Sequence, residues 1–115
     1  MTKADVLEYC SSITGAACDR PFENDFETWV ARHRDSKKWF AILMEHGGET
    51  IMNVKCEPFE GEMLREAYEA ITPAYHMNKT HWITLHIAAL SEGLIKELIR
   101  KSFALTDKKT KKKTS

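Results

Sequence analysis

The chain has 115 residues, of which 43% are hydrophobic and 30% charged, with 17 Lys and Arg balancing 17 Asp and Glu. These values predict one globular domain and exclude fibrous and membrane-spanning classes, because no apolar run approaches the roughly 18 residues that a bilayer span requires. Three cysteines without a CxxC pair, and a start without a signal-peptide core, predict a cytoplasmic protein with reduced thiols.

The two signs of charge are separated along the chain. Residues 106–115 hold five lysines and one aspartate, whereas residues 1–105 hold 12 basic and 16 acidic side chains. A segment without apolar residues cannot join a core, so we expect a single domain over residues 1–105 and a disordered Lys-rich tail over 106–115. Such a tail either keeps the protein soluble or holds nucleic-acid phosphates by Coulomb attraction.

The first half of the chain predicts one helix and three strands. Helical spacing of apolar residues begins after Thr2, a possible N-cap, and stops before Gly15. Residues 16–27 are expected to be irregular. Strand-like runs follow at Thr28–Arg32, Lys38–Met44 and Ile51–Cys56, and the turn residues between them predict antiparallel hairpins. Residues 39–44 are apolar throughout, as in a central strand covered on both faces.

The second half predicts a helix, a strand and a final helix. Pro58 suits the first position of a helix, and the expected apolar stripe of that helix is Phe59, Met63, Leu64, Ala67, Tyr68 and Ile71. Residues 72–73 end it, and a loop runs to Lys79. Residues 81–87 alternate as a strand does, and Ser91 caps the last helix. This order predicts a two-layer α+β domain, with helices on one face of an antiparallel sheet of about four strands.

Motifs for catalysis and metal binding are missing from the sequence. It contains no phosphate-binding loop, dinucleotide fingerprint, HExxH, GxSxG or EF-hand motif. His76, His81 and His86 are five residues apart, which fits neither a helix nor one face of a strand, so no zinc site is expected. Cys56 has no histidine nearby in sequence to activate it, which weighs against a catalytic thiol. We therefore expect no enzymatic activity, no cofactor and no metal.

Three surfaces are candidates for binding a partner. Glu62, Glu66 and Glu69 share a predicted helix face, which is either simply solvated or attracts a cation or a basic protein. One face of the last strand carries Trp82, with Trp29 or Trp39 beside it, and either stacks on a base or packs beneath residues 16–27. The basic residues that could contact nucleic acid are Arg32, Arg34, Lys37, Lys38, Lys79, Lys96 and Arg100.

Residues 71–82, with the sequence ITPAYHMNKTHW, are not explained by periodicity. They resemble the signature of the MmcQ/YjbR family, small bacterial proteins in which P-x-Y-H-M-N-K-x-H-W precedes the last strand. Residues 98–103 are similar to the C-terminal L-I-x-x-S-Y pattern of that family. Thr80 stands where the family often has a basic residue. The matched motif residues are Tyr75, His76, Asn78, Lys79, His81 and Trp82.

The resemblance implies a frataxin-like (CyaY-like) fold and a non-enzymatic, DNA-binding function. The alternative is a protein- or cation-binding module that uses Glu62, Glu66 and Glu69, by analogy with the acidic ridge of frataxins. A third hypothesis is an enzyme with a pocket around His76, His81 and Tyr75. The motif itself is either structural or a binding site, because Asn78 can bond its own backbone at a turn and Lys79 can meet an anion.

Overall fold

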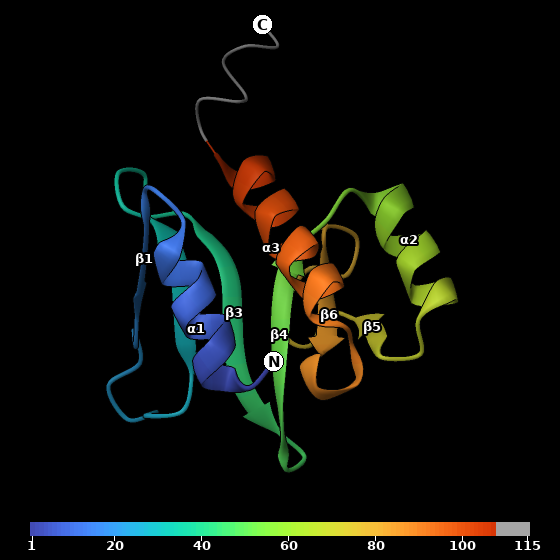
Figure 1. Ribbon diagram of the computed structural model, residues 1–115, viewed down its shortest axis with the longest axis horizontal. Coiled ribbons are helices and arrows are strands. Elements are labelled where there is room, and N and C mark those ends of the chain that lie inside the picture. The colour runs from blue at the N-terminus through green and yellow to red at the C-terminus, as the bar shows by residue number, and fades with distance from the viewer. Residues whose placement is uncertain (108–115) are drawn as a thin grey trace, which may run out of the picture.

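The computed structural model describes residues 1–107. Its six strands form one antiparallel sheet in the order β1-β2-β3-β4-β6-β5. Together with three α-helices and one 3₁₀ turn they make an α+β domain, as predicted (Figure 1). In chain order the elements are α1 (Lys3–Ser12), β1 (Ala16–Asp19), β2 (Trp29–His33), β3 (Trp39–His46), β4 (Glu49–Lys55), α2 (Pro58–Ala67), β5 (Ile71–Pro73), β6 (Trp82–His86), η1 (Ile87–Ala89) and α3 (Glu92–Thr106).

All three α-helices pack on the same face of the sheet. α1 lies against β1 and β2, α3 crosses β3 and β4, and α2 lies at the β5 edge (Figure 1). The main core fills the space between this face and the helices, because alternate residues of each strand point into it. Its largest fully buried side chains include Phe40, Leu43, Met52, Ile83, Leu85, Ile95 and Ile99.

The sheet has six strands rather than the predicted four, because both outer strands were missed. β1 lies within the segment that was expected to be irregular, and β5 follows α2 directly. Ala16 is the only fully buried residue of β1, and β5 has three residues that end in Pro73. Neither strand is long or alternating enough to be recognised locally. A proline is tolerated in β5 because this strand lies at the edge of the sheet, where its missing N–H is not needed.

The four predicted strands are confirmed with small shifts at their ends. β3 is one of the two central strands, and its residues Phe40, Ala41, Ile42 and Leu43 are all buried, because the helices cover one face and loop residues such as Phe22 and Tyr75 lie over the other. A register shift between Ala31 and Arg32 occurs where β2 pairs with β3. It places Phe40 toward the helices and leaves Trp39 on the opposite face, in contact with Phe22.

The predicted apolar stripe of α2 is mostly wrong, since Leu64 is its only helical member that packs against the core. Phe59 is 74% exposed and Met63 55% exposed, and the only buried residue of α2 is Gly61. A Cβ atom at Gly61 would lie 3.3 Å from the Ile83 side chain, so the helix approaches the sheet through a residue that has no side chain. Because α2 sits at the narrow β5 edge, little sheet surface is available to cover its apolar residues. The helix also ends at Ala67, before Tyr68 and Ile71.

α3 is tied to the sheet through one buried hydroxyl. Ser102 donates to the backbone oxygen of Phe40 at 2.5 Å, and its oxygen accepts from the backbone N–H of Lys55 at 2.8 Å. α3 extends through Thr106, one residue past the predicted domain boundary, and residues 108–115 of the predicted tail lie outside the described residues. Among residues 1–107, no helix is both long enough and apolar enough to span a bilayer.

Candidate functional site

The face of the sheet opposite the helices, here called the open face, carries a row of mostly polar residues. Ile42, Asn53, Thr84 and Thr72 are cross-strand neighbours on β3, β4, β6 and β5. Two loops, residues 20–28 and 74–81, line cavities on this face together with side chains of the strands. Trp39 lies on the open face, whereas Trp29 packs against the core on the helical face. The site is therefore bounded by strands below and by loops at its sides.

A buried polar network fixes the 74–81 loop on the sheet. The Asn53 amide nitrogen donates to the backbone oxygen of Tyr75 at 2.8 Å, and the Tyr75 N–H donates to the Thr84 hydroxyl at 2.9 Å. The Thr84 hydroxyl in turn donates to the Asn53 side-chain oxygen. Asn53 is fully buried and Thr84 is 2% exposed, so these hydrogen bonds have no competition from water. The sequence showed a hint of this network, because Asn53 is a polar residue inside an apolar strand.

The motif also contains the turn that leads into β6. The Asn78 side-chain oxygen accepts from the backbone N–H groups of Thr80 and His81 at 2.8 and 3.1 Å, which confirms the expected local role of Asn78. The left-handed residue is His76, with φ of 59°. Such a conformation is uncommon for a non-glycine residue, and histidine adopts it more readily than most. The backbone here fixes where the His76 ring is presented.

A cavity of about 410 Å³, here called the basic cavity, lies beneath this loop. The basic side chains that line it are His46, His76, His86 and Lys79. The Tyr75 ring lies between two of the imidazoles, with its centroid 4.1 Å from that of His46 and 4.0 Å from that of His76. Within residues 1–107, the side chains of His46, His76 and Lys79 make no hydrogen bond or ion pair. They are available to an anion.

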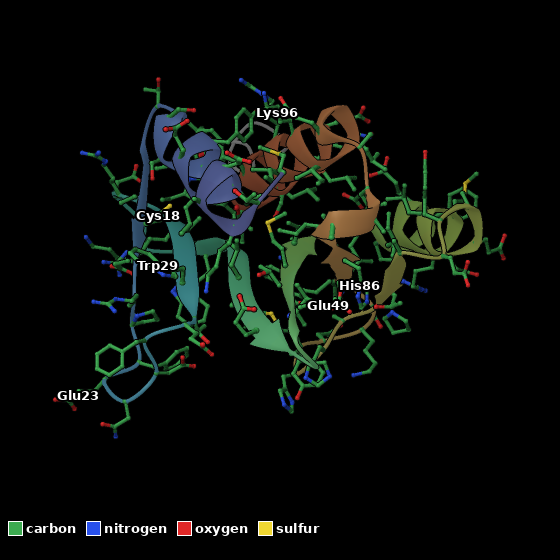
Figure 2. All side chains as sticks on the ribbon, turned by 60° about the horizontal axis from the view of Figure 1, so that its bottom comes forward. Cys18, Glu23, Trp29, Glu49, His86 and Lys96 are labelled. Carbon is green, nitrogen blue, oxygen red and sulfur yellow. The ribbon has the colours of Figure 1, made fainter. Side chains whose placement is uncertain are left out.

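His86 is held from both sides and differs from the other two imidazoles. Its Nδ1 lies 3.1 Å from the Glu49 carboxylate and its Nε2 lies 3.2 Å from the Thr72 hydroxyl. Figure 2 shows His86 and Glu49 next to each other below the helices, whereas Lys96 lies above them. Glu49 and Thr72 therefore occupy both ring nitrogens of His86. The ring forms a wall of the basic cavity and links β4, β6 and β5.

A second cavity of about 330 Å³, here called the apolar cavity, adjoins the first. Its floor is formed by Trp39, Ile42 and Met44 of β3, and its walls are Phe22, Asp25 and Thr28 on one side and Tyr75, His76 and Met77 on the other. The Asp25 carboxylate accepts from the Thr28 hydroxyl and from the backbone N–H groups of Glu27 and Thr28. These hydrogen bonds, the Thr28 hydroxyl first, lower the pKa of Asp25.

The predicted basic residues do not form one surface. Lys96 pairs with Glu92 and, like Arg100, lies over the Tyr9 ring on the helical side. Arg32 pairs with Asp19. Arg34 donates to the backbone oxygen of Ala16 at 3.0 Å, and Lys37 and Lys38 lie in the exposed β2–β3 turn. Lys79 alone of this set lines the basic cavity. His81 and Trp82 of the motif line neither cavity.

The acidic residues also separate in the structure. Glu62 and Glu66 are exposed on α2, but Glu69 follows the end of the helix, so the prediction that all three share a helix face is wrong. Glu60 pairs with Lys101 at 2.8 Å and lies 3.6 Å from the Cys56 sulfur. No cluster of three metal-binding side chains occurs among residues 1–107.

Cys56 is expected to react slowly with thiol reagents. Burial, followed by the Glu60 carboxylate, raises the pKa of Cys56 to about 11, and burial raises that of Cys10 to about 12. At pH 8 about a thousandth of the Cys56 thiol is therefore in the reactive thiolate form, and this fraction grows as the pH rises toward 11. Ellman's reagent at pH 8 should react with all three thiols promptly only in denaturant. Rapid labelling of Cys56 in the native protein would contradict this expectation.

The chain is similar to proteins whose function is not described. A family model described as YjbR matches residues 11–105. The uncharacterised protein YyaQ of Bacillus subtilis is 34% identical over 92% of this chain and 98% of its own length. The uncharacterised protein YjbR of Escherichia coli K12 is 28% identical over 90% of this chain and 85% of its own length.

Solved structures agree with this relationship. A Pseudomonas syringae protein superposes with a TM-score of 0.84 at 33% identity, covering 93% of this chain and all (100%) of the other. A Deinococcus radiodurans protein with a DUF419 domain gives a TM-score of 0.81 at 29% identity, covering 94% and 80%. The family expected from the segment between Tyr75 and Trp82 is confirmed: the chain belongs to the YjbR family.

Proposed function

We propose that this protein is a non-enzymatic nucleic-acid-binding domain that holds a single strand on its open face. The observation that carries the proposal is the basic cavity, in which the side chains of His46, His76 and Lys79 make no hydrogen bond or ion pair with the described residues. Imidazole N–H groups and an ammonium are suitable donors for phosphate oxygens. The aromatic ring of Tyr75 between the two imidazoles adds a surface on which a base can stack.

The distribution of charge favours a single strand over a duplex. A duplex presents regularly spaced phosphates to a broad basic surface, whereas here Lys96 and Arg100 lie on the opposite side of the sheet from Lys79. A hollow with one lysine and two imidazoles instead fits one or two phosphates of a strand whose bases are unstacked. The DNA-binding hypothesis from the sequence is therefore restricted to the open face of the sheet.

Fluorescence anisotropy with labelled DNA of roughly 12 nucleotides tests this proposal, as a single strand and as a duplex. Binding should be tighter to the single strand and should weaken only several-fold between 50 mM and 200 mM salt, because one or two phosphates are contacted. Lys79→Gln should reduce affinity several-fold, and the matched control Lys96→Gln should leave it unchanged. A chain that ends at Asp107 should show a shallower salt dependence if the Lys-rich tail contributes.

Equal effects of the two lysine variants would contradict binding on the open face. Absence of binding to either DNA at 50 mM salt would refute the proposed function.

The hydrogen-bonded chain Thr72–His86–Glu49 has the order of partners of a nucleophile–base–acid triad. We propose that it is structural, linking the edge strand to its neighbours. The test is hydrolysis of p-nitrophenyl acetate. If the native protein hydrolyses this ester and Thr72→Val abolishes the activity, the non-enzymatic assignment is wrong.

A second candidate function is supported by α2. Phe59 and Met63 are one turn apart and largely exposed, beside the exposed carboxylates of Glu62 and Glu66. Such a mixed surface complements a basic amphipathic peptide segment of a partner protein. We also propose a relationship to frataxins. It is supported by the α+β arrangement, in which helices at both ends of the chain cover one face of the sheet. The calorimetry described next tests both proposals.

Calorimetry distinguishes a protein-binding surface on α2 from a cation-binding site. A Lys/Leu-rich amphipathic peptide should bind the native protein, and both Phe59→Ser/Met63→Ser and Glu62→Gln/Glu66→Gln/Glu69→Gln should weaken that binding. Binding of Fe²⁺ that only the triple glutamine variant removes would favour a cation site instead. Unchanged peptide binding by both variants would exclude α2 as a protein-binding surface.

A further inference from the structure

The two cavities on the open face are complementary in chemistry and share a wall. Tyr75 and His76 line both of them. On one side lie the unpaired donors His46, His76 and Lys79, and on the other lies an apolar floor of Trp39 and Ile42. Volumes of about 410 and 330 Å³ are within the range of small-molecule sites. A ligand that spans the shared wall would carry an anionic group at one end and a planar apolar group at the other.

We propose that the paired cavities bind one nucleoside monophosphate unit, with the base in the apolar cavity and the phosphate in the basic cavity. This inference rests on the proposed function and names the unit that the site recognises. It implies that the site binds a free nucleoside monophosphate in addition to a nucleotide within a strand. The alternative, a phosphate-backbone site indifferent to the base, would use the basic cavity alone.

The apolar cavity offers faces for a flat ring and one polar edge. Phe22 and Trp39 meet edge to face, with centroids 6.1 Å apart, and Met77 supplies a polarisable side chain on the opposite wall. Asp25 also lines this cavity, and its carboxylate, which accepts from Thr28 and Glu27, has lone pairs left to accept a further hydrogen bond. A carboxylate only accepts hydrogen bonds, so this edge favours a base that presents N–H donors, as guanine does.

The basic cavity offers fixed donors to a phosphate. His76 is held by its left-handed backbone, and Tyr75, whose backbone is bonded to Asn53 and Thr84, supports both neighbouring imidazoles. Because the two imidazoles already pack against Tyr75, less conformational entropy is lost when the phosphate binds them. Glu49, the nearby carboxylate, is occupied by His86 and does not need to be displaced.

Isothermal titration calorimetry with guanosine 5′-monophosphate, guanosine and inorganic phosphate tests the inference on the full chain. The monophosphate should bind at least tenfold more tightly than either fragment, because it engages both cavities. Phe22→Ala should weaken monophosphate binding about tenfold and leave phosphate binding unchanged, since Phe22 is half-exposed and its loss spares the core. Lys79→Gln should weaken binding of the monophosphate and of phosphate, but not of guanosine.

The control variants change residues of the same type that do not line either cavity. Phe26→Ala alters an exposed ring of the same loop that does not line the cavity, and Lys96→Gln alters a lysine on the other side of the sheet. Both should leave all three affinities unchanged. Circular dichroism of Phe22→Ala and Lys79→Gln should match that of the native protein, and a variant that unfolds is replaced by Met77→Ala or Lys79→Met.

The outcomes separate this inference from the proposed function. Strand binding without any monophosphate binding, or equal affinity for monophosphate and phosphate, overturns the inference and leaves the proposed function intact. Monophosphate binding without strand binding refutes the proposed function and retains the paired site for a free nucleotide. If neither ligand binds, both are wrong.

Discussion

Replacing Asn53 with alanine is expected to lower the free energy of unfolding by about 2–4 kcal/mol, because two buried groups lose their partners. The carbonyl oxygen of Tyr75 loses its donor at 2.8 Å, and the Thr84 hydroxyl loses its acceptor. Asn53 is fully buried, so replacing its hydrogen bonds with bonds to water costs free energy. Urea denaturation measures the loss, and hydrogen exchange at the Tyr75 amide should show that the 74–81 loop opens first.

Asn53→Asp tests the same network through the pH dependence of stability. The aspartate keeps an acceptor for Thr84 but, when ionised, places a buried charge against the Tyr75 carbonyl oxygen. Burial raises the pKa of such a carboxyl in the folded state above its unfolded value, so stability relative to the native protein should fall as the pH rises above roughly 4. Asn24→Ala, in the exposed 20–28 loop, is the control. Equal stability losses at positions 24 and 53 would show that the network does not fix the loop.

Phe40→Ala is expected to cost about 3–5 kcal/mol, which is a large part of the total stability of a domain of this size. Phe40 is fully buried at the centre of an aromatic group, with ring centroids 5.6 Å from His33 and 5.0 Å from Phe103. Those two rings stack on each other at 4.1 Å, and His33 is further bonded to the Thr106 hydroxyl at 2.8 Å. Truncation leaves a cavity that this rigid group cannot close.

Thermal and urea unfolding measure this loss, and Phe40→Leu, expected to cost about 1.5 kcal/mol, keeps the test usable if the alanine variant does not fold. Phe59→Ala is the matched control, because Phe59 is 74% exposed and its removal should change stability by about 0.5 kcal/mol or less. Comparable losses at positions 40 and 59 would mean that Phe59 is covered in solution, which is the result expected if α2 binds a second molecule.

The candidate site was only partly predictable. The motif from Tyr75 to Trp82 marked the correct loop, and Asn78 was assigned its local turn. His46 and Phe22 were missed, because they come from β3 and the 20–28 loop, far from the motif in sequence, and meet it only across the open face. Lys96 and Arg100 were grouped with Lys79 by charge alone, and the sheet separates them.

The sequence by itself determined the α+β class, the antiparallel central strands, both terminal helices and the family. These features follow from short-range patterns, such as the alternation of residues 81–87 and the cap at Ser91, which the Ser91 hydroxyl makes by accepting from the Leu94 N–H. Tertiary structure decided the outer strands β1 and β5, the exposed side of α2 and the composition of both cavities. Edge strands and loop walls depend on what a distant segment offers for pairing or covering, and no local pattern carries that information.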